Sequence, residues 1–138
     1  MANEALIGAI KDIVALAKSG DFDAAYAGYQ ALFGSAEFST YRPEDQRQAL
    51  KLMVLAKGVP ERPTSAMVEA HRTALGPLTE LVSSYGEPAD HELLGVCHVV
   101  LGNEESASNI FKAGLAIERE RDAASDLCGQ LMKHVASV

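Results

Sequence analysis

The side chains of this chain that could support acid–base, nucleophilic or metal chemistry belong to four histidines and two cysteines. No HExxH, paired CxxC, glycine-rich phosphate loop or GxSxG pattern occurs in the sequence. The residues therefore match none of the common metalloprotease, zinc, nucleotide or hydrolase motifs. They are His71, His91, His98, His134, Cys97 and Cys128.

A metal or thiol site near Cys97 is the one arrangement that their spacing suggests. His91 and His98 are seven positions apart, which places them on the same side of a helix, and both residue types can bind zinc. Adjacent residues, however, point about 100° apart on a helix, and no carboxylate completes a ligand set. We interpret His98 as a packing residue and His91 as part of a helix start, and we expect no metal, no cofactor and no catalytic residue. Cys97 and Cys128 are expected to be buried free thiols.

The composition indicates the elements that position these residues. The chain has 138 residues, of which 48% are apolar and only 6% aromatic, with no Trp. Alanine and leucine are abundant, whereas long runs with the alternation typical of strands are missing. We therefore predict an all-α protein that forms a single domain over residues 1–138, large enough to bury a core without disulfide or metal cross-links.

The charge distribution limits the possible partners. The formal net charge is −7, from 19 acidic and 12 basic residues, and the basic residues are scattered singly. Because a nucleic-acid binder needs a basic stripe, we expect no nucleic-acid partner, and anionic membrane surfaces are disfavoured for the same reason. The N-terminal segment lacks a basic region, and no uncharged apolar stretch approaches 18 residues. The sequence is thus typical of a soluble, cytoplasmic protein, of the kind common in bacteria, without membrane insertion.

Helical periodicity predicts about seven helices. Asp21 is well placed to cap the second helix and Pro43 to begin the third, and the apolar stripe of the fourth keeps its phase through Pro77. A linker is expected between the second and third helices, through Tyr41, and the mixed charges of residues 118–122 suggest a solvated helix end. The expected helices cover residues 3–18, 22–33, 43–57, 64–85, 89–101, 104–117 and 122–136.

One phrase occurs twice, at residues 20–33 and 102–115. Each copy begins with a glycine in a small polar turn, has an alanine five positions later and an aromatic residue nine positions later. The glycine suits a tight turn between two helices, the alanine allows their close approach, and the aromatic ring fills the space between them. The residues concerned are Gly20, Ala25 and Tyr29 in the first copy and Gly102, Ala107 and Phe111 in the second.

The repeated phrase resembles the helix-turn-helix unit of the tetratricopeptide repeat, whose period is about 34 residues. Phe22 matches the aromatic of the turn in the first unit, and Leu94 and Gly95 match adjacent helix positions in the second. The outer glycines are further apart than two periods, so the middle unit, with Gly58 as its turn, is degenerate or enlarged. The resemblance implies a right-handed array of antiparallel helical hairpins in which the last helix caps the array.

The same resemblance implies a binding surface. In the family, partner segments lie against the inner faces of the first helix of each hairpin. The basic residues of the family's carboxylate clamp are not present at these positions, so the expected groove is apolar and suits a hydrophobic or amphipathic segment. The positions are Ile10, Val14, Ala17, Gln48, Leu52, Leu55, Glu92, Val96 and Val99.

We therefore expect a non-catalytic protein–protein interaction module, of adaptor or chaperone type, that binds a protein or peptide on its concave face. The enlarged middle hairpin or the last helix could instead fill the groove and make its residues part of the core. Two other functions stay open: a self-associating structural domain, for instance a homodimer, and a small helical enzyme or ligand-binding bundle. The last would use His71, His98 or Cys97 in a buried pocket.

Overall fold

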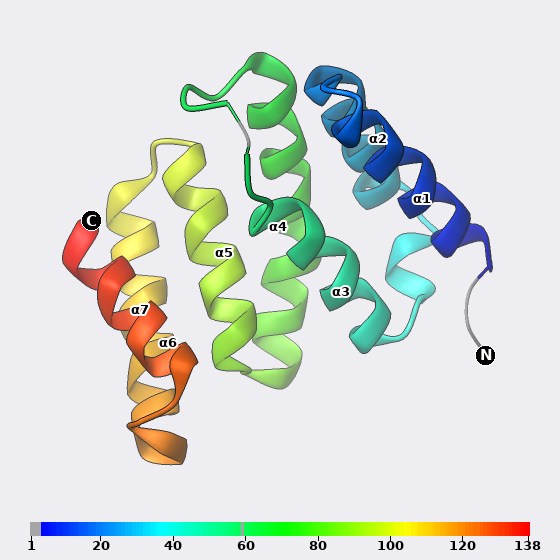
Figure 1. Cartoon of the computed structure of the whole chain (residues 1–138). Coiled ribbons are helices and arrows are strands. Elements are labelled where there is room, and N and C mark those ends of the chain that lie inside the picture. Colours follow the sequence, from blue (N-terminus) through cyan, green and yellow to red (C-terminus); the bar gives the residue numbers. More distant parts are fainter. Residues whose placement is uncertain (1–3, 59) are drawn as a thin grey trace. The chain divides into compact units, whose positions relative to one another are not determined.

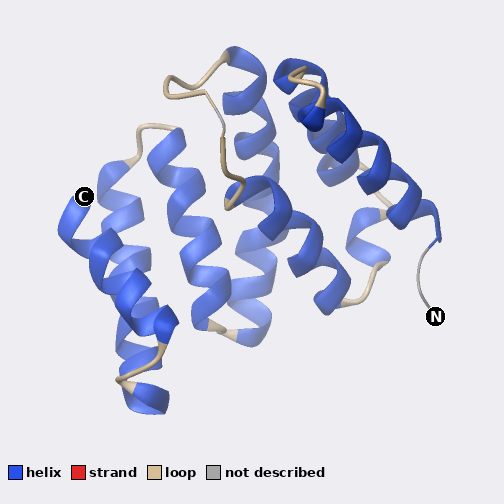
Figure 2. Cartoon of the chain, in the orientation of Figure 1, coloured by secondary structure: helices blue, strands red, loops and turns tan. Residues whose placement is uncertain are grey.

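A computed structural model of the chain describes residues 4–58 and 60–138, and helices are the only regular elements of this part (Figures 1 and 2). Over the described residues the prediction of an all-α protein with seven α-helices is confirmed. A short 3-10 helix, η1 (Phe38–Thr40), adds to them. The α-helices are α1 (Glu4–Lys18), α2 (Phe22–Gly34), α3 (Pro43–Val54), α4 (Ser65–Tyr85), α5 (Pro88–Val100), α6 (Glu104–Asp122) and α7 (Asp126–Ser137).

The chain divides into two compact units, Met1–Pro77 and Leu78–Val138. Unit 1 contains α1, α2, η1, α3 and the first part of α4, and unit 2 contains the rest of α4 with α5, α6 and α7. The boundary falls at Pro77, inside α4, which runs through this proline as predicted. The single domain over residues 1–138 stays a prediction.

Local side-chain chemistry sets the helix starts. The Asp21 carboxylate accepts a hydrogen bond from the Ala24 amide at 3.3 Å, so its predicted capping role is confirmed. Gly20 has a φ of +87°, a left-handed conformation that favours glycine in the turn before α2. Pro43 occupies the first turn of α3, as predicted. The cap expected from Asn3 lies outside the described residues.

The C-terminal helix boundaries differ from the prediction. The mixed charges of residues 118–122 do not end α6 early but form its last turn, where Arg119 and Arg121 suit the negative end of the helix dipole. The last helix begins at Asp126, four residues later than expected, because Ser125 provides the cap. Its hydroxyl accepts a hydrogen bond from the Cys128 amide at 3.0 Å.

The core of unit 1 is built around the aromatic residues of α2. Ala25 is buried where α1 and α2 pack together, in agreement with its predicted role. Phe33 packs edge-on against Phe38, with 5.2 Å between ring centroids, and Phe38 is fully buried. The segment expected to be only a linker thus contributes a core side chain, because η1 turns Phe38 inward.

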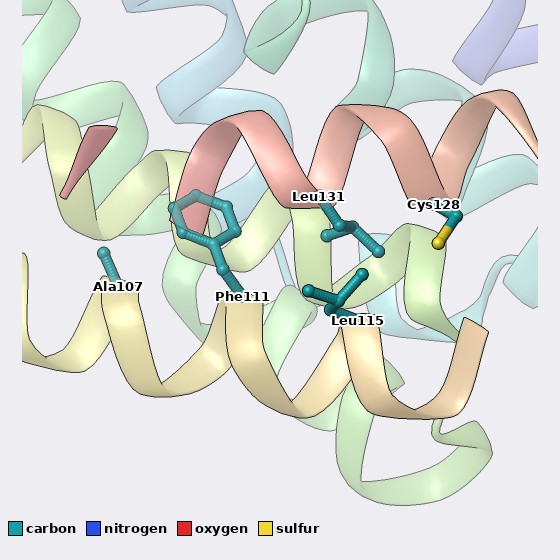
Figure 3. Packing of buried hydrophobic residues seen from close by; sticks show 5 residues of the cluster. All are labelled: Ala107, Phe111, Leu115, Cys128 and Leu131. Atoms are coloured by element: carbon teal, nitrogen blue, oxygen red, sulfur yellow. The ribbon is translucent and has the colours of Figure 1, made fainter. Parts of the chain in front are cut away.

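The core of unit 2 lies between α6 and α7, both of which contact α5 (Figure 3). The Phe111 ring is fully buried, and the ring of His134 stacks on it with 4.5 Å between centroids. A methyl group added at Gly95 of α5 would lie 2.3 Å from Phe111 Cε1, so the α5 backbone itself touches this ring. The cluster consists of Ala107, Phe111 and Leu115 of α6 with Cys128 and Leu131 of α7.

We expect Gly95→Ala to destabilise the protein by about 1–3 kcal/mol, because the new methyl group must displace a ring that has no room to move. Gly129→Ala in α7 is the matched control. A methyl group there meets nothing within 4 Å, so helix propensity should raise stability by about 0.5–1 kcal/mol. Chemical denaturation followed by circular dichroism measures both changes. Equal stability of the two variants would show that α5 and α6 do not approach this closely.

Candidate functional site

Unit 1 contains two adjoining pockets that share Leu52 and lie along α1 and α3. The larger has a volume of about 440 Å³ and is bounded by α1, α2 and the end of α3. The smaller has a volume of about 200 Å³ and lies between the first half of α1 and the middle of α3. We call the two pockets together the α1–α3 groove.

The groove brings together most of the residues that the sequence predicts for the first two helices of the binding face. Val14 and Ala17 line the larger pocket, Ile10 and Gln48 line the smaller one, and Leu52 lines both. These side chains meet because α1 presents them one helical turn apart, and α3 presents Gln48 and Leu52 in the same way. Whether they bind a partner stays a prediction.

The other predicted positions lie elsewhere. Leu55, just after α3, lines neither pocket. Glu92, Val96 and Val99 belong to α5 in unit 2. Glu92 is buried, Val96 packs against the core cluster, and Val99 is exposed. Glu92 accepts a hydrogen bond from His134 Nε2 of α7 at 3.0 Å, so within unit 2 this carboxylate contacts another helix.

Large apolar side chains on the groove are open to water. Leu52 is 40% exposed and Ile7, in the smaller pocket, is 43% exposed. Single exposed aliphatic residues are common on proteins, but a group of them around pockets is typical of an interaction site. Leu6, Ile10 and Val14 follow one another at intervals of four residues in sequence, so they lie along one face of α1.

The lysines of the groove and Tyr26 were not predicted as site residues. Lys18 and Lys57 line the larger pocket and Lys11 the smaller. Lys11 and Lys18 are seven positions apart on α1, a spacing that could have placed them on the groove side. Tyr26 also lines the larger pocket. Burial raises the pKa of Tyr26, and its buried hydroxyl has no hydrogen-bond partner among the described residues.

His71, His91 and Cys97, which were considered for catalysis or metal binding, are buried, and both histidines are hydrogen-bonded to backbone carbonyl oxygens. His71 Nδ1 donates to the Met67 carbonyl oxygen at 2.7 Å, and burial lowers the pKa of His71, so its ring is neutral at pH 7. His91 Nδ1 donates to the Glu87 carbonyl oxygen at 2.8 Å. Burial raises the pKa of Cys97 to about 12, so it is a thiol rather than a reactive thiolate. In residues 4–58 and 60–138, no group of three or more His, Cys, Asp or Glu side chains is placed to hold a metal ion.

Comparison with known proteins gives no match to a protein-family model, to a curated protein or to a solved structure. A membrane-crossing helix, long and apolar enough to span a bilayer, is not found in the described part of the chain.

The buried His71 should make stability depend on pH. Because its pKa in the folded protein lies below the ordinary value of 6.5, the unfolded chain takes up the proton more readily. The free energy of unfolding should consequently fall as the pH drops below about 6.5. Urea denaturation at several pH values should show a smaller fall for His71→Gln than for the wild type. Parallel pH profiles for the two proteins would contradict this assignment.

Proposed function

We propose that the protein is a non-catalytic interaction module, of adaptor or chaperone type, and that it binds a segment of a partner protein in the α1–α3 groove. This proposal rests on the exposure of Leu52. The side chain lines both apolar pockets and is 40% exposed. An apolar side chain in that position gains stabilisation only when a second molecule removes it from water.

The size of the groove suits a side-chain ligand. Its larger pocket falls within the range of about 300–1,000 Å³ that is typical of ligand sites. Removing a large aliphatic side chain from water contributes about 1.5–3 kcal/mol, so burial of Leu52, Ile7 and the partner's own apolar residues can support a specific complex. Recognition of an amphipathic helix in an apolar groove works in this way.

The tetratricopeptide resemblance supports the same surface. In that family the inner faces of the first helices of the hairpins bind partner segments, and α1 and α3 would be the first helices of the first two hairpins. The acidic composition and the buried free thiols also suit the cytoplasmic location that we propose.

Binding is favoured over catalysis because the groove contains no histidine or cysteine among its described lining residues. The imidazole of His71 is engaged with the backbone of its own helix. Self-association through the groove is the second possibility, since a second copy could also cover Leu52. Sedimentation of the wild type and of Leu52→Glu separates self-association from binding of another protein.

We expect Leu52→Glu to weaken partner binding at least about tenfold, because docking would bury a carboxylate in an apolar pocket. Leu55→Glu is the matched control, since Leu55 lies on the same segment with a similar exposure of 37% but lines neither pocket. Proteins captured from a cell extract on immobilised wild type should be lost from Leu52→Glu and retained by Leu55→Glu, as quantified by mass spectrometry.

Circular dichroism should show the same helical content for all three proteins, because the carboxylate introduced by either substitution can reach water in the free protein. Capture of the same proteins by the wild type and both variants would refute the proposed function. A wild-type dimer that Leu52→Glu converts to a monomer in sedimentation experiments would identify a second copy as the occupant of the groove.

A further inference from the structure

We infer that the α1–α3 groove selects an acidic amphipathic helix, with two large apolar side chains about two turns apart and carboxylates beside them. This inference rests on the proposed function and specifies the chemistry of the partner. It is carried by the lysines that line the groove and by the spacing of the two pockets.

The groove is basic although the chain is acidic. Lys11, Lys18 and Lys57 line its pockets, and none of them forms an ion pair within the described residues. Asp45 is the one carboxylate among the described residues that line the two pockets. It accepts from Arg42 Nε at 3.1 Å, so its charge is already compensated.

Two acidic side chains at the start of α2 form hydrogen bonds within unit 1. Asp21 caps α2, and Asp23 accepts a hydrogen bond from the Thr64 hydroxyl at 3.0 Å. Among the described residues that line the groove, three lysines thus stand against the single carboxylate of Asp45. A ligand that places carboxylates beside an apolar side chain would complement both features of this surface.

The spacing of the pockets indicates a helix. Along α1, Ile7 and Ile10 line the smaller pocket and Val14 and Ala17 line the larger, a separation of about two turns or roughly 10 Å. Side chains at i and i+7 of a partner helix are separated by the same distance. Leu52 stands between the pockets, so the partner needs a small residue at the intervening i+3 or i+4 position.

An anionic lipid is a second ligand that combines an apolar body with a negative charge. A fatty-acyl chain needs one continuous channel, whereas here Leu52 separates two pockets of different size. The helix fits this division better, because each of its two apolar side chains fills one pocket. Binding of a fatty acid is therefore the alternative result that the experiment can detect.

The test is selection from a displayed library of helical peptides about 16 residues long, long enough to span both pockets. Selection is performed on the wild type, on Leu52→Glu and on the Lys18→Glu/Lys57→Glu double variant. The Lys112→Glu/Lys133→Glu double variant is the control for net charge, because both lysines are exposed and belong to unit 2. Fluorescence anisotropy then measures the affinity of a selected peptide for each protein.

We expect the wild type to enrich peptides with apolar residues at i and i+7 and a net negative charge, and Leu52→Glu not to enrich them. Each lost lysine–carboxylate pair should weaken binding roughly twofold to fivefold, so Lys18→Glu/Lys57→Glu should bind at least about fivefold more weakly. The Lys112→Glu/Lys133→Glu variant should bind like the wild type.

The possible failures are distinguishable. Enrichment of neutral or basic peptides that still require Leu52 would overturn the acidic-helix inference and leave the proposed function standing. If no peptide is enriched in a Leu52-dependent manner, both are overturned. Palmitate binding to the wild type that Leu52→Glu abolishes, in the absence of such peptides, would then assign the groove to a lipid.

Discussion

The packing of each unit depends on a helix backbone that comes close enough to touch a large side chain of its neighbour. In unit 2, a methyl group at Gly95 would lie 2.3 Å from the ring of Phe111, and one at Gly114 would lie 2.7 Å from His91 Cβ. In unit 1, a methyl group at Gly28 of α2 would lie 2.7 Å from Ile13 of α1. Because interiors are close-packed, these contacts fix the rotation of one helix against the other. The contact at Ile13 thereby determines which side of α1 is left for the groove.

Local signals made much of this fold predictable. Asp21, Pro43 and the glycine of the first turn act within a few residues of their own position, so their roles could be derived from the sequence. Phe38 could not, because its burial depends on a 3-10 turn and on the ring of Phe33. The late start of α7 was missed because the capping role of Ser125 is evident only from its hydrogen bond with the Cys128 amide.

The candidate site was predictable where one helix determines it. The resemblance gave Ile10, Val14 and Ala17 on α1 and Leu52 on α3, and these side chains line the groove. Glu92 holds the corresponding position on α5, yet within unit 2 it contacts His134 of α7. The apolar residues of one helix show which of its faces is apolar, but they do not show which other element covers that face. The covering element depends on contacts between residues far apart in the chain. The lysines of the groove were missed because only the fold shows which side chains line the two pockets.

The groove carries positive charge and the whole chain carries a net negative charge, and these two charges act over different distances. At physiological ionic strength, exposed charges more than about 8–10 Å apart are largely screened. The net charge of −7 is therefore largely screened before two molecules touch, whereas Lys18 and Lys57 act at contact distance. Long-range charge governs association rates, and desolvated contacts govern dissociation. An acidic helix would thus be retained by the apolar pockets and their lysines, and an acidic chain without the matching apolar side chains would dissociate faster.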